Sequence, residues 1–259
     1  MTFGSLFAGI GGFDLGFERA GMECKWQCEI DPFCQKVLAK HWPDVQRYGD
    51  IKEVDWNEVE RVDVVCGGFP CQPVSVAGKR LAQEDERWLW PEFARCLSVL
   101  RPRFAVMENV PGLLTAGVGD VLGDLWSLGY DAEWQVISAA DMGAPHRRER
   151  VWIVAYANGG DGFDFRIMQP DRQESEGVQF WSGRIDELGA SNGEQRSDAY
   201  PGIVRAFHGI PDRVDRLKSL GNAVVPQIPE WIGRRLMTFE EPVRDRCESP
   251  VLAFAEPLV

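Results

Sequence analysis

The sequence predicts an α/β fold built on a doubly wound, mostly parallel sheet with a small, irregular second lobe. Two observations carry this prediction. Apolar runs of strand length alternate with amphipathic stretches of helix length through the first half of the chain. A glycine-rich turn also follows the first apolar run and opens the first amphipathic stretch. Such alternation is typical of βαβ units, whose ligands lie at the carboxyl ends of the parallel strands.

Each element has a local reason in the sequence. Short apolar runs predict strands at residues 2–7, 23–29, 63–66, 104–107 and 151–155. Apolar residues at helical spacing predict helices at residues 12–20, 32–41, 92–100, 118–128 and 229–239. Gly21 and Gly129 follow two of these helices, Pro32 lies in the first turn of another, and Pro102 stops a fourth.

The pattern changes after Tyr156. Residues 157–208 are rich in Gly, Ser, Asn, Gln and acids, and they contain nine acidic residues, five arginines and no lysine. We therefore divide the chain into a main domain at 1–156, a small lobe at 157–208, a segment at 209–239 that returns to the main domain, and a tail at 240–259.

Composition limits the class of protein. The 259 residues include seven scattered cysteines, which favours reduced thiols in a cytoplasmic protein over disulfides. No apolar run is long enough for a membrane span, and the N-terminus lacks the basic region of a signal peptide. The net charge of −12 argues against nucleic-acid binding, but local patches matter more than the total. Basic residues do cluster, at Lys79, Arg80 and Arg87, at Arg147, Arg148 and Arg150, and at Arg213, Arg216 and Lys218.

The turn "LFAGIGGFDLGFERAG" places glycines directly after a strand and before a helix. It fails the dinucleotide fingerprint, because the last glycine position is occupied by Asp14, and it lacks the GK[ST] ending of a phosphate loop. A nucleoside-like ligand without a pyrophosphate fits better. Glu29 and Asp50 follow later strands, where a carboxylate commonly binds ribose hydroxyls. The alternative is a structural turn with two solvated acids.

A second group of residues has catalytic character. Cys71 lies between Pro70 and Pro73 in "GGFPCQPVS", and a thiol held rigidly on a loop suits a nucleophile. Glu108 ends an apolar strand in "MENVPG". Desolvation at such a position raises the pKa of a carboxyl group, which suits it to act as an acid. Arg148 and Arg150 are two residues apart, so a strand would point both to one face.

Together these motifs resemble the DNA cytosine-5 methyltransferases. "FAGIGGFDLGFERAG", "GGFPCQPVS", "ENVPGLL", "PHRRERVWIVA" and "LGNAVVP" occur in the order of that family, over residues 3–155 and 209–239. The compact length and the ending are similar to the short phage or prophage type. The resemblance implies methyl transfer from S-adenosylmethionine to carbon 5 of a cytosine flipped out of double-stranded DNA. In that reaction the Cys71 thiolate adds to carbon 6, and Glu108 neutralises the ring at N3.

The resemblance also implies roles for the other residues. Arg148 and Arg150 would hold the flipped base, with Arg148 at the cytosine O2. Phe7 would stack on the adenine of the cofactor, Glu29 would bind its ribose, Ile30 would cover the adenine and Asp50 would accept from its amino group. The remaining cofactor residues would be Ala8, Gly9, Gly11, Gly12, Ile51, Pro70, Trp90, Asn222 and Ala223. Residues 70–89 would form a lid that contacts the DNA backbone through Ser75, Lys79, Arg80 and Arg87.

The sequence departs from the family pattern at Ser5 before the glycine turn and at His146 before the arginines, in the short link between "GIPDR" and "LGNAVVP", and in the small, acidic stretch at 157–208. Three rivals remain: an RNA methyltransferase of the same family, a catalytically silent binding protein, and a zinc module using Cys24, Cys28, Cys34 and His41. GGFPCQPVS favours DNA over RNA, the four catalytic residues argue against a silent protein, and the zinc spacing matches no standard site. We expect a monomer. The DNA site, the base that removes the carbon 5 proton, and the existence of a restriction enzyme partner are not determined.

Overall fold

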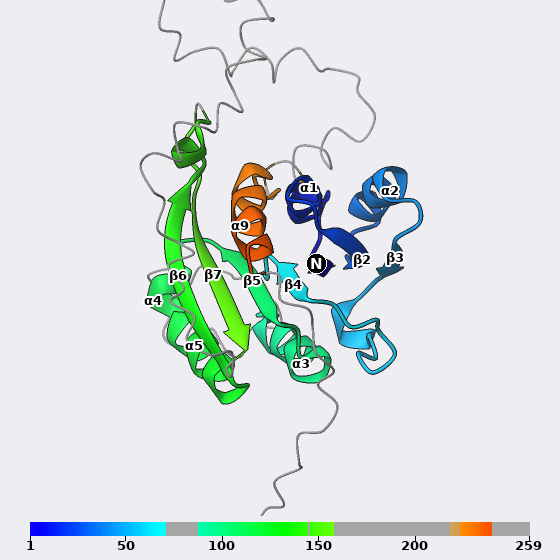
Figure 1. Ribbon diagram of the computed structural model, residues 1–259, viewed down its shortest axis with the longest axis horizontal. Helices are drawn as coiled ribbons and strands as arrows, with labels where there is room; N and C mark the ends of the chain where they lie inside the picture. Colours follow the sequence, from blue (N-terminus) through cyan, green and yellow to red (C-terminus); the bar gives the residue numbers. More distant parts are fainter. Residues whose placement is uncertain (71–87, 145, 158–218, 220, 222, 240–259) are drawn as a thin grey trace, which may run out of the picture.

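The computed structural model describes residues 1–70, 88–144, 146–157, 219, 221 and 223–239. In these ranges the chain forms a seven-stranded sheet in the order β3-β2-β1-β4-β5-β7-β6 (Figure 1). The strands are β1 (Thr2–Leu6), β2 (Glu23–Cys28), β3 (Gln46–Tyr48), β4 (Val64–Gly67), β5 (Phe104–Asn109), β6 (Tyr130–Ser138) and β7 (Glu149–Ala157).

The first five strands in the sheet order are parallel, whereas β7 runs antiparallel to both β5 and β6. The sheet is therefore mostly parallel, as the sequence predicts. The helices are α1 (Gly12–Arg19), α2 (Pro32–His41), α3 (Trp90–Leu100), α4 (Leu113–Ala116), α5 (Val118–Ser127) and α9 (Gln227–Met237). Two 3-10 helices, η1 (Ile51–Glu53) and η2 (Ala139–Met142), complete the described elements.

Helices cover both faces of the sheet. Along β5, Phe104 and Val106 pack into the core shared with α1 and α9, while Ala105 and Met107 pack into the core shared with α3 and α5. Successive side chains of a strand point to opposite faces, so a strand buried on both sides is apolar throughout. This explains why β4 and β5 are near-continuous apolar runs.

Most predicted elements agree with the structure to within one or two residues at their ends. The third helix begins at Trp90 rather than Glu92, because Pro91 fits the first turn, where no backbone N–H is required. Two strands were missed. β3 is only three polar residues long, and β6 is an edge strand whose Asp131, Glu133 and Gln135 alternate with apolar residues.

The C-terminal helix α9 packs against α1 (Figure 1). Two glycines make this close approach possible. A Cβ on Gly12 would lie 2.6 Å from the Val224 carbonyl oxygen, and one on Gly16 would lie 2.5 Å from that of Pro226. The buried Glu230 of α9 adds an ion pair to Arg19 of α1 at 3.9 Å. The segment after residue 223 thus lies on the helix that begins at the glycine turn.

None of the helices in the described part of the chain combines the length and apolar character that crossing a bilayer requires.

Candidate active site

The topology brings the candidate residues to one edge of the sheet. The glycine turn follows β1, Glu29 follows β2, Asp50 follows β3 and the GGFP turn follows β4. Glu108 ends β5, and the antiparallel β7 starts at this same edge, since Asn109 is paired with Val151. The reversal of β7 is what places Arg148 and Arg150 beside Glu108 rather than at the opposite edge.

The glycine turn has an unusual backbone. Phe7, Gly9 and Gly11 have φ values of 51°, 56° and 87°, a region that costs a residue such as Phe strain. The turn is held to β2, because Ala8 N–H donates to the Cys28 carbonyl at 3.1 Å and Gly9 N–H donates to Glu29 Oε2 at 2.7 Å. The direction of a Cβ on Gly9 is open, with no atom nearer than 4.0 Å. This opening leaves room for a ligand to approach the backbone of the turn.

Glu29 and Asp50 are organised by backbone groups. The other oxygen of Glu29 accepts from Asp31 N–H at 2.7 Å, and Asp50 caps η1 by accepting from Lys52 N–H at 3.0 Å. Ile30 beside Glu29 is 65% exposed, whereas Ile51 is buried. An open glycine turn, two fixed carboxylates and an exposed apolar side chain match a nucleoside that carries a cationic amino-acid chain. The residues present therefore fit S-adenosylmethionine.

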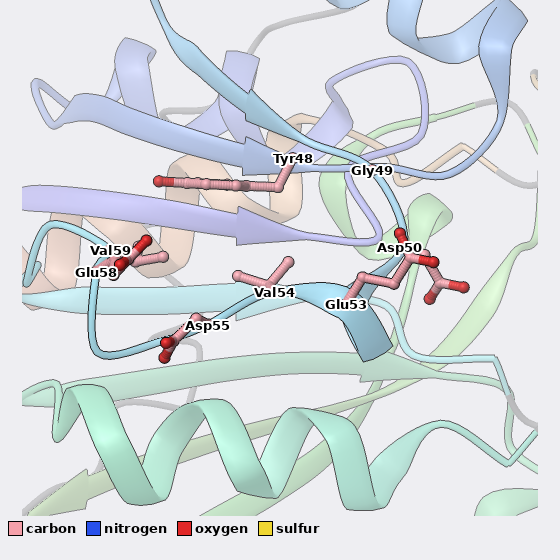
Figure 2. Close-up of a pocket in the computed structure, with 8 residues that line it drawn as sticks. All are labelled: Tyr48, Gly49, Asp50, Glu53, Val54, Asp55, Glu58 and Val59. Carbon is pink, nitrogen blue, oxygen red and sulfur yellow. The ribbon is translucent and has the colours of Figure 1, made fainter.

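A pocket adjoins Asp50 (Figure 2). Four of its lining residues are acidic, and Figure 2 shows Asp50 and Glu53 close together at one end with Glu58 at the other. Its lining consists of Tyr48, Gly49, Asp50, Glu53, Val54, Asp55, Glu58 and Val59. Of these residues, sequence reasoning selected only Asp50. The pocket thus extends away from the glycine turn along the loop after β3.

Glu108 lies in a nearly enclosed position. Its side chain is 12% exposed, and its Oε1 pairs with Arg150 Nε at 2.8 Å. Burial raises the pKa of Glu108, while the nearby Arg150 and Arg148 oppose that rise. A carboxyl group in this setting holds a proton more readily than a solvated one, as a general acid requires.

The end of β5 also holds the turn that leads to Cys71. The Asn109 side chain donates to the Phe69 carbonyl oxygen at 2.9 Å and accepts from Val110 N–H at 2.8 Å. A Cβ on Gly68 would lie 2.8 Å from Glu108 Oε2. Sequence reasoning did not assign roles to Gly68 or Asn109, although both belong to the quoted motifs. They bring the acid and the turn before the thiol into contact.

The two arginines have different partners. Arg150 faces Glu108, whereas Arg148 is half-buried and donates from Nη2 to the Ala223 carbonyl at 3.0 Å. Arg150 is therefore the partner of the acid, and Arg148 joins the start of β7 to the C-terminal segment. The role of Arg148 at the cytosine O2 stays a prediction.

Trp90 is also placed differently from the expectation. It is 1% exposed, and its indole N–H donates to the Asp124 side chain at 2.8 Å. Its ring stacks on Phe93 with centroids 5.7 Å apart. A side chain committed to the core in this way offers no surface to a cofactor, so the predicted contact from Trp90 is not supported.

Several predicted residues lie outside the described ranges. They are Cys71, Ser75, Lys79, Arg80, Arg87 and Asn222, together with residues 158–208 of the small lobe and the tail at 240–259. Pro70, the last described residue before Cys71, is exposed. Within the described ranges no group of His, Cys, Asp and Glu is arranged to hold a metal ion. Two of the cysteines proposed for the zinc module form separate hydrogen bonds. The Cys24 thiol donates to the Asp14 side chain, and the Cys28 thiol donates to the Gly49 carbonyl oxygen.

The described fold is a mostly parallel α/β sheet, and the edge at the carboxyl ends of its parallel strands holds a glycine turn and fixed carboxylates that fit S-adenosylmethionine. The sequence model of the C-5 cytosine-specific DNA methylase family matches residues 1–195, and the chain belongs to that family.

Curated relatives and solved structures extend this comparison. The type II methyltransferase M.NgoFVII of Neisseria gonorrhoeae is 37% identical over 178 residues, which cover 66% of this chain and 47% of that protein. M.BsuFI of Bacillus subtilis is 36% identical over 181 residues, covering 67% and 44%. The chain therefore spans about half the length of these relatives. A chain described as a DNA modification methyltransferase encoded within an Escherichia coli prophage shares the fold. Its TM-score is 0.62 at 19% identity, over 92% of this chain and 99% of that one.

Proposed function

We propose that this protein is a DNA cytosine-5 methyltransferase that acts on a cytosine flipped out of double-stranded DNA. The observation that carries the proposal is the contact of Glu108 with Arg150 and with Gly68, because Gly68 lies three residues before Cys71. An acid and a cation near the turn that precedes a thiol in the sequence suit the addition of that thiol to a cytosine ring. Membership of the C-5 cytosine-specific family supports the same reaction.

The protein groups would act as follows. The Cys71 thiolate adds to carbon 6, which pushes electrons toward carbon 5 and the N3 side of the ring. Glu108 shares its proton with N3, and Arg150 holds the polar edge of the base. Bound S-adenosylmethionine supplies an electrophilic methyl group for carbon 5. Loss of the carbon 5 proton and then of the Cys71 sulfur restores the aromatic ring and frees the thiol.

The cofactor would be held by the edge formed by β1, β2 and β3. Phe7, Ala8 and Gly9 would face it, Glu29 would bind its ribose hydroxyls, and Ile30 and Asp50 would contact the adenine. Gly11 and Gly12 would contribute only backbone atoms. The side on which each would carry a Cβ faces Trp42 and Val224, respectively. Ala223 and Asn222 would close the pocket from the C-terminal side.

The remaining parts of the proposal concern DNA. Residues 70–89 would close over the duplex through Ser75, Lys79, Arg80 and Arg87, and the lobe at 157–208 would read the sequence. The type II names of the relatives suggest a modification enzyme with a cognate restriction enzyme. We expect it to act as a monomer in the cytoplasm.

The direct test is transfer of a labelled methyl group to duplex DNA, with tRNA as the parallel substrate and bisulfite sequencing to locate the product. We expect labelled 5-methylcytosine in DNA and none in tRNA. Labelling of tRNA alone would support the RNA alternative. If both substrates remain unlabelled although the protein binds S-adenosylmethionine, the protein is a silent member of the family.

A further inference from the structure

We propose that Asp14 determines cofactor specificity, because its buried negative charge favours the cationic methyl donor over the product that has lost the methyl group. This inference rests on the proposed function. It concerns a side chain that the mechanism above does not use.

Asp14 joins three elements directly behind the glycine turn. It lies in the first turn of α1, two residues after Gly12, and is 0% exposed. Its carboxylate accepts from the Ser5 hydroxyl of β1 at 3.1 Å and from Gln27 Nε2 of β2 at 2.8 Å. The Cys24 thiol of β2 adds a longer contact at 3.6 Å. All three partners are neutral, so they orient the carboxylate without neutralising it.

No cation compensates this charge within the described part of the chain. The titratable groups facing Asp14 are the Cys24 thiol of β2 and the Cys66 thiol of β4, and burial raises the pKa of both, which keeps them uncharged. Glu230 of α9, the helix packed on α1, pairs with Arg19 and Arg234 instead. A buried charge without a counter-ion is costly, so a cationic ligand near Asp14 would offset part of that cost.

The chemistry of the cofactor supplies the missing positive charge. S-adenosylmethionine carries a sulfonium, whereas the demethylated product carries a neutral thioether and is otherwise the same. A glycine turn at a helix N-terminus by itself favours anions, because the backbone N–H groups and the helix dipole are positive there. A carboxylate in the first turn of α1 reverses that preference. The charge on Asp14 therefore favours the donor and helps the product to leave.

Protonation of Asp14 provides a second test of the proposal. Burial raises the pKa of Asp14 to about 6. The carboxyl is therefore charged above that pH and neutral below it, and the preference for the sulfonium is expected to weaken as the pH falls through about 6. The ammonium and carboxylate of the two ligands titrate alike, so the ratio of their affinities isolates the sulfonium.

The experiment measures the dissociation constants of S-adenosylmethionine and S-adenosylhomocysteine by calorimetry for the wild type, Asp14→Asn and Glu18→Gln. Glu18→Gln is the matched control, because it removes an exposed carboxylate from the same helix and keeps an acceptor for the Trp42 indole, which donates to Glu18. At about pH 7.5 we expect Asp14→Asn to reduce the preference for the donor by about five- to twentyfold, the range for one charge acting through a partly buried medium.

Three outcomes are informative. Loss of the preference in Asp14→Asn, together with its loss in the wild type below about pH 6, supports the proposal. Equal weakening of both ligands in Asp14→Asn means that Asp14 only shapes the turn, and overturns it. If Asp14→Asn does not fold, an unchanged ratio in the wild type across the same pH range overturns it instead. Failure of the wild type to bind either ligand contradicts the proposed function itself.

Discussion

Glu108 Oε1 and Arg150 Nε lie 2.8 Å apart at the junction of two antiparallel strands. The pair joins the end of β5 to the start of β7, and both side chains are mostly buried. A partly desolvated pair of this kind needs both members, because removing one leaves the other charge without compensation.

Replacing Cys71 by Ala is expected to abolish methyl transfer, since no other group is expected to add to carbon 6. Binding of S-adenosylmethionine is expected to change little, because the thiol is not a proposed cofactor ligand. Methyl transfer is measured with labelled cofactor and binding by calorimetry. Methylation at near the wild-type rate in this variant would contradict covalent catalysis.

Glu108→Gln keeps the shape of the side chain but cannot supply the proton. We expect kcat to fall by about 10²- to 10⁴-fold, the usual contribution of general acid–base catalysis, with DNA affinity preserved. Single-turnover kinetics and a DNA-binding titration separate the two effects. A loss of less than about threefold would assign Glu108 a structural role, since it falls far below that contribution.

Gly68→Ala tests how closely the acid must approach the turn before Cys71. The added Cβ would lie 2.8 Å from Glu108 Oε2, so the carboxylate must move. We expect kcat to fall by about 10- to 100-fold through misplacement of Glu108, with cofactor affinity unchanged. Gly119→Ala on α5 is the control, because a Cβ there meets nothing within 4 Å. Equal activity of the two variants would show that the contact at Gly68 is unimportant.

Asp14 has a predicted effect on stability. Its pKa is raised from 3.8 to about 6 in the folded protein, so the folded state holds the proton more tightly than the unfolded state. The free energy of unfolding therefore decreases as the pH rises between these values, by on the order of 3 kcal/mol for this group. Denaturant unfolding at a series of pH values is expected to show a flatter profile for Asp14→Asn. If the free energy of unfolding depends on pH in the same way for the wild type and Asp14→Asn, the raised pKa of Asp14 is ruled out.

The lobe at 157–208 is expected to contribute specificity more than affinity, because its acids repel phosphate. Replacing its arginines one at a time should relax sequence choice by up to about 1–3 kcal/mol each, whereas replacing Lys79 or Arg80 should weaken binding to all sequences and reduce its salt dependence. The lobe arginines are Arg166, Arg172, Arg184, Arg196 and Arg205. Bisulfite sequencing identifies the DNA motif that each variant methylates. An unchanged motif in all five variants would show that residues outside the lobe recognise the DNA sequence.

The sequence by itself determined five of the seven described strands and the residue types that stand at their ends. Apolar runs such as β4 and β5 are local signals, since a strand buried on both faces must be apolar throughout. The glycine turn and Glu29 directly follow their strands and Glu108 lies at the end of β5, so their place at one edge follows from parallel strand order. The alternation in β6 was present as well and could have been recognised.

Only the tertiary structure decided which side chains meet. The reversal of β7 depends on pairing between strands far apart in the sequence, and it selected Arg150 rather than Arg148 as the partner of Glu108. The burial of Trp90 likewise depends on Phe93 and Asp124 packing around it. In the sequence, Asp14 only occupies the position where the dinucleotide fingerprint requires its last glycine. In the fold, side chains of β1 and β2 form hydrogen bonds to its carboxylate. Contacts of this kind come from long-range packing, which the spacing of residues along the chain does not encode.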